Sequence, residues 1–212
     1  ILQHKEQLPG IVGAVAELMD VPQEYTMAIE TALGAAAQHI VVEDEADARE
    51  AITYLKQQRA GRATFLPLTT IKGRQLSAGI ISQAQQIDGF VGIASELVTF
   101  SETVRPVVEN LLKTTLIAED LDSANVLARA VHYRYRVVSL DGDVMNAGGS
   151  MTGGATKRGN KGNLFSQTNE LQQLKEQKSR VDNRLQTTER QGQQFEKNVK
   201  ELVEKEYPYN IQ

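Results

Sequence analysis

A seven-residue repeat near the C-terminus is the feature that most constrains what this chain can fold into. Beyond Asn163 the composition shifts to Gln, Glu, Lys, Asn and Arg, and proline is absent until Pro208. The positions in a and d register are Leu171, Leu174, Lys178, Val181, Leu185, Thr188, Gly192, Phe195, Val199 and Leu202. This spacing predicts a coiled-coil helix of roughly 50 Å, weakened at its Lys, Thr and Gly positions. The alternative is a single solvated amphipathic helix.

Composition limits what the rest of the chain can be. The 212 residues are 41% hydrophobic and 24% charged, enough for one sizeable domain or two small ones plus the extension. A net charge of -4 argues against a protein that coats nucleic acid uniformly. The absence of cysteine excludes disulfides, thiolate zinc sites and iron–sulfur clusters. We expect no membrane span and no signal peptide, and, because the chain begins at Ile1, a piece of a longer protein.

The residues before the repeat alternate between helical and strand patterns, which predicts a mixed α/β fold. Helices are expected over 24–38, 45–58, 102–112 and 121–131, and strands over 39–44, 61–68, 114–120 and 135–143. The segment "IVVEDEADAREAI" from Ile40 matches "LIAEDLDSANVLA" from Leu116 in part. We therefore predict two related half-domains in tandem. Residues 69–97 fit neither pattern clearly.

The stretch "GDVMNAGGSMTGG" from Gly142 to Gly154 raises the question of function. Such a density of glycine serves positive φ angles, a phosphate ligand, or the approach of another chain. A phosphate loop needs lysine directly after its second glycine, and here Ala155 occupies that place although Gly149 and Gly154 have the right separation. A dinucleotide fingerprint cannot be aligned either. Nucleotide or phosphate binding stays open as the alternative function.

Other chemistry finds little support in the residues. Asp141 and Asp143 could hold a divalent metal, but Met145 stands where a third oxygen ligand should be. The three histidines are scattered and there is no Gly-x-Ser-x-Gly elbow, so we nominate no catalytic residue and no metal ligand. Approach by another chain remains: a bare strand edge can pair with a second copy and give a homodimer. A flexible glycine linker is the alternative.

The motifs "LDGDVMNAGGSMTGG", "TTLIAEDLDSA", "AIETALG" and "GRATFLPL" together resemble the hinge domain of bacterial SMC (structural maintenance of chromosomes) proteins over most of residues 8–154. The resemblance implies a two-lobed hinge that dimerises through both lobes and joins two chains at the ends of antiparallel coiled-coil arms. On this basis we expect an arm stub at 1–9, lobe I at 10–95, lobe II at 96–163, an outgoing arm at 164–206 and a tail of unknown origin at 207–212.

The resemblance also implies site residues, partners and a location. The glycine cluster would form the dimer contact, through Gly148, Gly149, Met151, Gly153 and Gly154. The chain would lack ATPase activity and cofactors, because ATP and Mg²⁺ would bind at head domains that are absent here. The protein would be cytoplasmic and associated with the nucleoid in chromosome condensation and segregation, without a membrane partner.

A second activity implied by the resemblance is weak, sequence-independent DNA binding near the junction of hinge and arm. The candidate contacts are Arg134, Arg136, Lys157, Arg158 and Lys161. Phosphate contacts of this kind would depend steeply on salt. The alternatives are a solvated basic junction without a ligand, and a DNA-binding module whose dimerisation is incidental.

Overall fold

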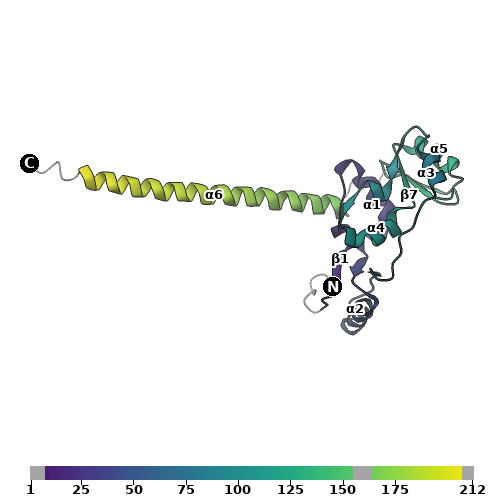
Figure 1. Ribbon diagram of the computed structural model, residues 1–212, viewed down its shortest axis with the longest axis horizontal. Coiled ribbons are helices and arrows are strands. Elements are labelled where there is room, and N and C mark those ends of the chain that lie inside the picture. The colour runs from purple at the N-terminus through teal and green to yellow at the C-terminus, as the bar shows by residue number, and fades with distance from the viewer. Residues whose placement is uncertain (1–7, 155–163, 207–212) are drawn as a thin grey trace, which may run out of the picture. The chain divides into compact units, whose positions relative to one another are not determined.

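The computed structural model describes residues 8–154 and 164–206, and the chain separates into two compact units, 1–167 and 168–212. The first unit contains sheets of mixed strand direction with helices packed on them (Figure 1). The described part of the second belongs to one long helix, α6 (Leu164–Glu206), which begins in the first unit. The predicted α/β fold followed by a long helix is therefore confirmed.

Two successive segments of the first unit fold in the same order of elements. The first comprises β1 (Ile11–Ala14), η2 (Val15–Glu17), β2 (Met19–Asp20), η3 (Gln23–Tyr25), α1 (Thr26–Leu33), η4 (Gly34–Gln38), β3 (Ile40–Val42), α2 (Glu45–Gln58) and β4 (Phe65–Pro67). The second comprises β5 (Phe90–Ile93), η5 (Ala94–Glu96), β6 (Thr99–Phe100), η6 (Glu102–Val104), α4 (Arg105–Leu112), β7 (Thr115–Ala118), α5 (Leu121–Ala130) and β8 (Arg136–Ser139). We call these segments the first and second repeats. Outside them lie α3 (Ala78–Ala84), β9 (Val144–Met145) and β10 (Met151–Thr152).

The sheets repeat the same pairing. One has the order β1-β3-β4 and the other β10-β9-β8-β7-β5, and in each repeat the first strand is antiparallel and the last strand parallel to the middle one. The short strands β2 and β6 pair with each other, with Asp20 opposite Thr99. Aligning Ile11 with Phe90 makes Asp20 and Thr99 equivalent. An approximate twofold axis therefore relates the two repeats through this pair.

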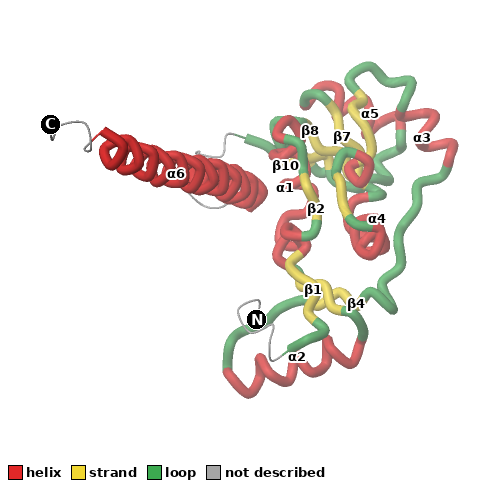
Figure 2. Tube along the Cα trace, turned by 60° about the vertical axis from the view of Figure 1, so that its left-hand side comes forward, coloured by secondary structure: helices red, strands yellow, loops and turns green. Residues whose placement is uncertain are grey.

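The two repeats share one hydrophobic core. Side chains alternate across a strand, so Val41 of β3 and Ile117 of β7 face this shared core, together with residues of α1 and α4. The adjacent residues of β3 and β7 face the opposite side of each sheet. There they pack into two separate hydrophobic clusters, one under α2 on the first sheet and one under α5 on the second. Figure 2 shows α2 beside the strands β1 and β4 on the side away from the rest of the unit. Each sheet is therefore covered on both faces.

Several predicted elements differ in extent. The helix expected over 24–38 ends at Leu33, because Gly34 has φ 51° and the chain continues as a 3-10 helix. The strand expected over 61–68 is reduced to β4. The strand expected over 135–143 ends at Ser139, and the chain then reverses through Gly142 at φ 90° into β9. The helix expected over 102–112 is divided into η6 and α4, and Pro106 is the second residue of α4, where proline is tolerated because it lies in the first turn.

The unassigned span 69–97 contains α3, β5 and η5, and so the start of the second repeat. A signal for it was present in the sequence: "IVGAVAEL" from Ile11 and "FVGIASEL" from Phe90 share Val, Gly, Glu and Leu at the same places. The second repeat thus begins before the boundary expected between 95 and 96. How these repeats relate to functional lobes stays a prediction.

Candidate functional site

The glycine-rich stretch forms a β-hairpin, in which β9 and β10 are antiparallel. Met151 lies opposite Met145 and Thr152 opposite Val144. The Asn146 N–H donates to the Ser150 carbonyl over 2.8 Å and closes the turn between the strands. β9 also pairs with β8, so the hairpin extends the sheet of the second repeat.

Gly148 and Gly149 shape the turn of this hairpin. Their φ angles are 89° and 91°, a region that residues with a Cβ atom rarely adopt. The Gly148 N–H donates to the Tyr133 carbonyl over 2.8 Å, and the Gly149 N–H donates to the Asn146 backbone carbonyl over 3.0 Å. These two glycines therefore have an intramolecular reason to be glycine.

The next two glycines lie against Asp143. A Cβ atom at Gly153 would come within 2.3 Å of Asp143 Oδ1, and the Gly154 N–H donates to the same oxygen over 3.3 Å. Gly154 also has a positive φ of 126°. The fold accounts for all four glycines without a second chain, so their predicted place in a dimer contact stays a prediction. The hairpin also gives no support to a phosphate loop, since Gly149 leads into a strand and not into a helix.

β10 is the outermost strand of its sheet among the described residues, and the backbone N–H and C=O of Met151 face away from the sheet. Residues of an antiparallel pair alternate between hydrogen bonding across the pair and pointing away from it. Asn146 and Ser150 are hydrogen-bonded to each other across the pair. The next residue of β10, Met151, therefore points its N–H and C=O away from β9, to the outer edge of the sheet. Met151 is 57% exposed, whereas the opposite Met145 is 1% exposed. The hairpin thus ends in an apolar side chain beside an open row of backbone groups.

The sheet of the first repeat has an open edge at the corresponding place. β4 is parallel to β3, with Phe65 opposite Ile40. The Ile40 N–H donates to Thr64 and the Leu68 N–H to Val42, both over 2.9 Å, so Phe65 turns its backbone away from β3. In the second repeat the equivalent of Phe65 is Val137, whose strand is covered by β9. Among the described residues, β4 has no such covering strand.

The predicted DNA contacts are divided by the structure. Arg134 and Arg136 lie at the exposed entry to β8, and Arg136 Nη1 donates to the Ala32 carbonyl over 3.2 Å. Lys157, Arg158 and Lys161 lie outside the described residues. Residues 8–154 hold 18 acidic against 11 basic side chains, a balance of -7. Any DNA contact therefore has to be local, because residues 8–154 as a whole repel phosphate.

Neither metal nor membrane chemistry gains support from the described residues. Within 8–154 and 164–206, no group of three or more His, Cys, Asp or Glu side chains is placed to hold a metal ion. None of the helices in those ranges is both long enough and apolar enough to cross a membrane.

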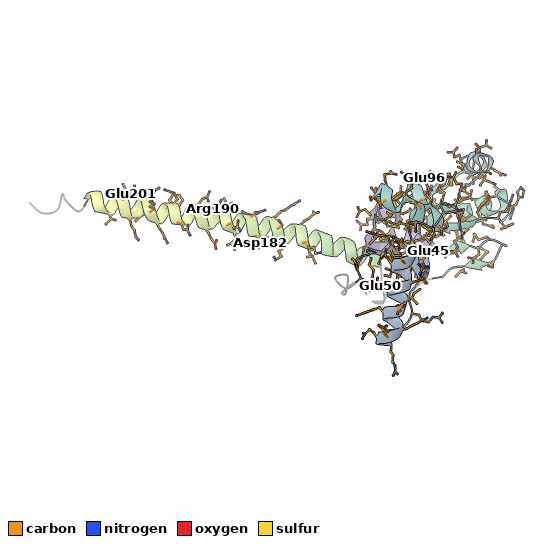
Figure 3. The ribbon with its side chains drawn as sticks, turned by 60° about the horizontal axis from the view of Figure 1, so that its bottom comes forward. Glu45, Glu50, Glu96, Asp182, Arg190 and Glu201 are labelled. Carbon is orange, nitrogen blue, oxygen red and sulfur yellow. The ribbon has the colours of Figure 1, made fainter. Side chains whose placement is uncertain are left out.

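The predicted coiled-coil seam lies on α6. The apolar a and d side chains with described surroundings are exposed, namely Leu174, Val181, Leu185, Phe195, Val199 and Leu202. Figure 3 shows Asp182, Arg190 and Glu201 projecting from the same helix. At 1.5 Å per residue, 43 residues extend for roughly 65 Å. The exposed apolar seam runs along this helix from Leu174 to Leu202 and is suited to pairing with another helix.

Two residues escaped the sequence-based search. Phe165, the second residue of α6, is 1% exposed, and its N–H donates to Glu30 Oε1 of α1 over 2.9 Å. Burial raises the pKa of the Glu30 carboxyl above its usual value, and the hydrogen bond from Phe165 opposes that rise. Glu30 looks like any polar position of a helix, so the sequence carries no signal for it. For Phe165 the sequence does carry a signal, because it is an isolated apolar aromatic residue at the change in composition.

Comparisons with known proteins point to one family. A family model described as "SMC proteins Flexible Hinge Domain" matches residues 8–128. The chain is 53% identical to the chromosome partition protein Smc of Bacillus subtilis over 174 residues, and 44% identical to that of Methanocaldococcus jannaschii over 150 residues. These matches cover 82% and 71% of this chain but 15% and 12% of the relatives. The chain thus spans a small part of the proteins that it matches.

Solved structures agree. The crystal structure of an asymmetric dimer of the Geobacillus stearothermophilus SMC hinge domain is similar at 47% identity and a TM-score of 0.78, covering 89% of this chain and 75% of that one. The Pyrococcus furiosus Smc hinge domain with an extended coiled coil is similar at 28% identity and a TM-score of 0.59, covering 94% and 70%. The similarity therefore includes both the globular unit and a helical extension.

Proposed function

Because this chain belongs to the family of SMC hinge domains, we propose that it is the hinge at which two copies of an SMC chain join end to end. The observation that carries the proposal is the outward edge at Met151. Strand edges with open N–H and C=O groups pair readily with a second chain. The known hinge from Geobacillus stearothermophilus was crystallised as a dimer, which supports the same assembly here.

We place the partner's β10 beside β4. Each copy offers one β10 edge and one β4 edge, so two copies related by a twofold axis satisfy both edges of both chains and close. The internal repeat supports this pairing, because β8 carries a strand on the flank that β4 leaves open. Both repeats would then contribute to the dimer, as the family resemblance implies for the two lobes.

In this role the chain performs no reaction and holds no cofactor. It supplies a joint, and α6 supplies one strand of the arm that leads away from it. The returning strand of an antiparallel coil would cover the exposed seam of α6. ATP binding and hydrolysis would belong to head regions outside the part that this chain covers. Action on the chromosome would place the hinge at the nucleoid.

DNA binding, as part of this proposal, is weak and confined to the junction. Arg134, together with Lys157, Arg158 and Lys161, which follow the glycine-rich stretch in the sequence, would supply phosphate contacts. The acidic balance of residues 8–154 keeps such contacts local and sensitive to salt.

Proline replacements test the joint directly. Met151→Pro removes an N–H that points to the outer edge and spares the β9–β10 hydrogen bonds, so we expect a folded monomer by light scattering. Met151→Ala keeps the backbone donor and serves as the control. Phe65→Pro should have the same effect on the β4 edge. A Met151→Pro chain that remains dimeric would contradict the use of this edge.

Mixing the two proline variants distinguishes pairing of β10 with the partner's β4 from pairing of β10 with the partner's β10. If β10 meets the partner's β4, a mixed pair regains one of its two contacts and forms a weak heterodimer. If β10 meets β10, mixing regains nothing. Addition of ATP to the parent chain tests the alternative function: a clear rise in melting temperature would revive nucleotide binding.

A further inference from the structure

The root of the arm helix is buried in the hinge. Phe165 is among the largest fully buried side chains of the described residues, and it belongs to the core shared by the two repeats. Beyond it, every described side chain of α6, from 174 to 203, is exposed. The described side chains of the helix thus divide between one buried aromatic at the start and an exposed remainder.

Glu30 meets the same turn of α6 from another element. The first four N–H groups of a helix have no partner within the helix. One of them, the Phe165 N–H, donates to Glu30 Oε1 over 2.9 Å, although the two residues are 135 positions apart. A carboxylate near a helix N-terminus also interacts favourably with the helix dipole. Glu30 therefore acts on α6 as a capping residue would, but from α1.

α1 is itself firmly held. Ala28 and Ile29 on its inner face are fully buried. Arg136 of β8 donates to the Ala32 carbonyl over 3.2 Å, and a Cβ atom at Gly142 would lie 3.0 Å from Thr31 Oγ1. The helix that carries Glu30 is thus fixed against the sheet that ends in β10.

We propose that Phe165 and Glu30 form a joint that fixes the first turn of the arm helix to the hinge core, with Phe165 as the buried anchor and Glu30 as the residue that positions the helix start. The inference rests on the proposed function, because the start of α6 needs a rigid attachment to the globular unit only if α6 is an arm through which force reaches the hinge. A pull on the arm then reaches α1, and through α1 the sheet with the β10 edge.

Amide hydrogen exchange on the full chain tests the joint. Glu30→Ala removes the acceptor, and we expect the Phe165 amide to exchange about tenfold faster, the factor given by the loss of an ordinary helix cap. Glu30→Gln keeps an acceptor oxygen and should restore most of the protection. Glu50→Ala is the matched control, because Glu50 is an exposed residue of α2. Phe165→Ala should loosen the whole first turn of α6.

The outcomes separate the joint from the hinge function. Unchanged exchange at Phe165 in Glu30→Ala would overturn the joint, as would equal acceleration in β3 and β7, which would indicate general destabilisation. Rescue by Glu30→Gln supports positioning through the acceptor. Solution mass is measured on the same samples: a monomeric parent contradicts the hinge proposal, whereas the exchange of Phe165 decides the joint.

Discussion

Asp44 and Asp120 occupy the same place in the two repeats, 76 residues apart, and have the same backbone conformation. Their φ and ψ angles are -143° and -177° at Asp44, and -142° and -179° at Asp120. Each carboxylate accepts from the N–H three residues ahead, at 3.0 Å from Asp47 and 2.7 Å from Ser123. Each therefore ends a core strand and starts the helix that covers the sheet. The internal repeat thus extends to individual hydrogen bonds.

Loss of either cap should destabilise the fold in a pH-dependent way. The pKa of both carboxyls is lowered, first of all by backbone hydrogen bonds from Asp47 to Asp44 and from Ser123 to Asp120. A lowered pKa means that the stabilisation is present at neutral pH and is lost as the pH falls below about 3.8, through the lowered value. We expect Asp44→Ala and Asp120→Ala to melt a few degrees below the parent at pH 7, with the difference closing in acid.

Serine replacements provide the control, because Asp44→Ser and Asp120→Ser keep a capping oxygen without the charge. They should retain most of the stability, and their melting should not share the acid dependence of the parent. Equal losses in the Ala and Ser variants would contradict a capping role.

The shared core should make the two repeats unfold together. Ile117 is fully buried in the cluster that also contains Val41 of the first repeat. Ile117→Val should lower the free energy of unfolding by about 1 kcal/mol. Hydrogen exchange should show the same loss in β3 as in β7, because one core supports both. Ile52→Val, at a partly exposed position of α2, is the control. Loss confined to β7 would show that the repeats unfold separately.

Gly153 and Asp143 should behave as a coupled pair. Gly153→Ala forces the Asp143 carboxylate aside and breaks its hydrogen bond from Gly154, at a cost of about 1 kcal/mol. Asp143→Ala removes the same bond, so the double variant should be little less stable than either single one. Chemical denaturation of the four chains measures this, and strictly additive losses would argue that the two residues act independently.

Arg136 and Arg134 should separate structure from DNA binding. Arg136→Ala loses a hydrogen bond to the end of α1 and should melt at a lower temperature than the parent. Arg134→Ala should leave the melting temperature unchanged. If Arg134 contacts a phosphate, its removal makes the negative slope of log affinity against log salt less steep by about 0.9. Fluorescence anisotropy with a labelled duplex measures that slope, and an unchanged slope would remove Arg134 from the contact.

Ionisation of the Glu30 carboxyl should cost stability, because the penalty for burying its charge is larger than the gain from its hydrogen bond with the Phe165 N–H. Its pKa is raised, chiefly by burial, so the charged form is disfavoured in the folded protein. The resulting cost is present above the raised pKa and is relieved as the pH falls through it. Glu30→Gln should therefore be at least as stable as the parent at neutral pH, and the two should converge in acid. Thermal melts across pH 4 to 8 measure this difference, and a Gln variant that is less stable throughout would contradict it.

The sequence indicated a large part of the architecture. The alternation of helical and strand patterns located β3, β7 and β8, and with them the helices α2 and α5. Spacing of seven located α6. These features depend on residues close together in the chain, where periodicity and caps act directly. The similarity between "IVGAVAEL" and "FVGIASEL" could also have located β5 in advance.

The fold gives the glycines of this stretch an intramolecular role that the sequence did not indicate, while their contact with another chain stays a prediction. From the sequence, its glycines indicated a contact with another chain. In the fold they meet Tyr133 and Asp143, and the outward edge belongs to Met151. Which backbone groups face outward depends on hydrogen bonds between strands, and those follow from register, which glycine content does not specify.

The sequence by itself determined the local elements, the tandem repeat and the arm helix, because propensity, capping and periodicity act over a few residues. The tertiary structure alone decided that the repeats share one core, that β4 and β10 are the open edges, and that Glu30 meets Phe165. Each of these pairs residues far apart in the chain, and such pairs are selected by burial and packing of the whole unit. A single sequence carries no local signal for them.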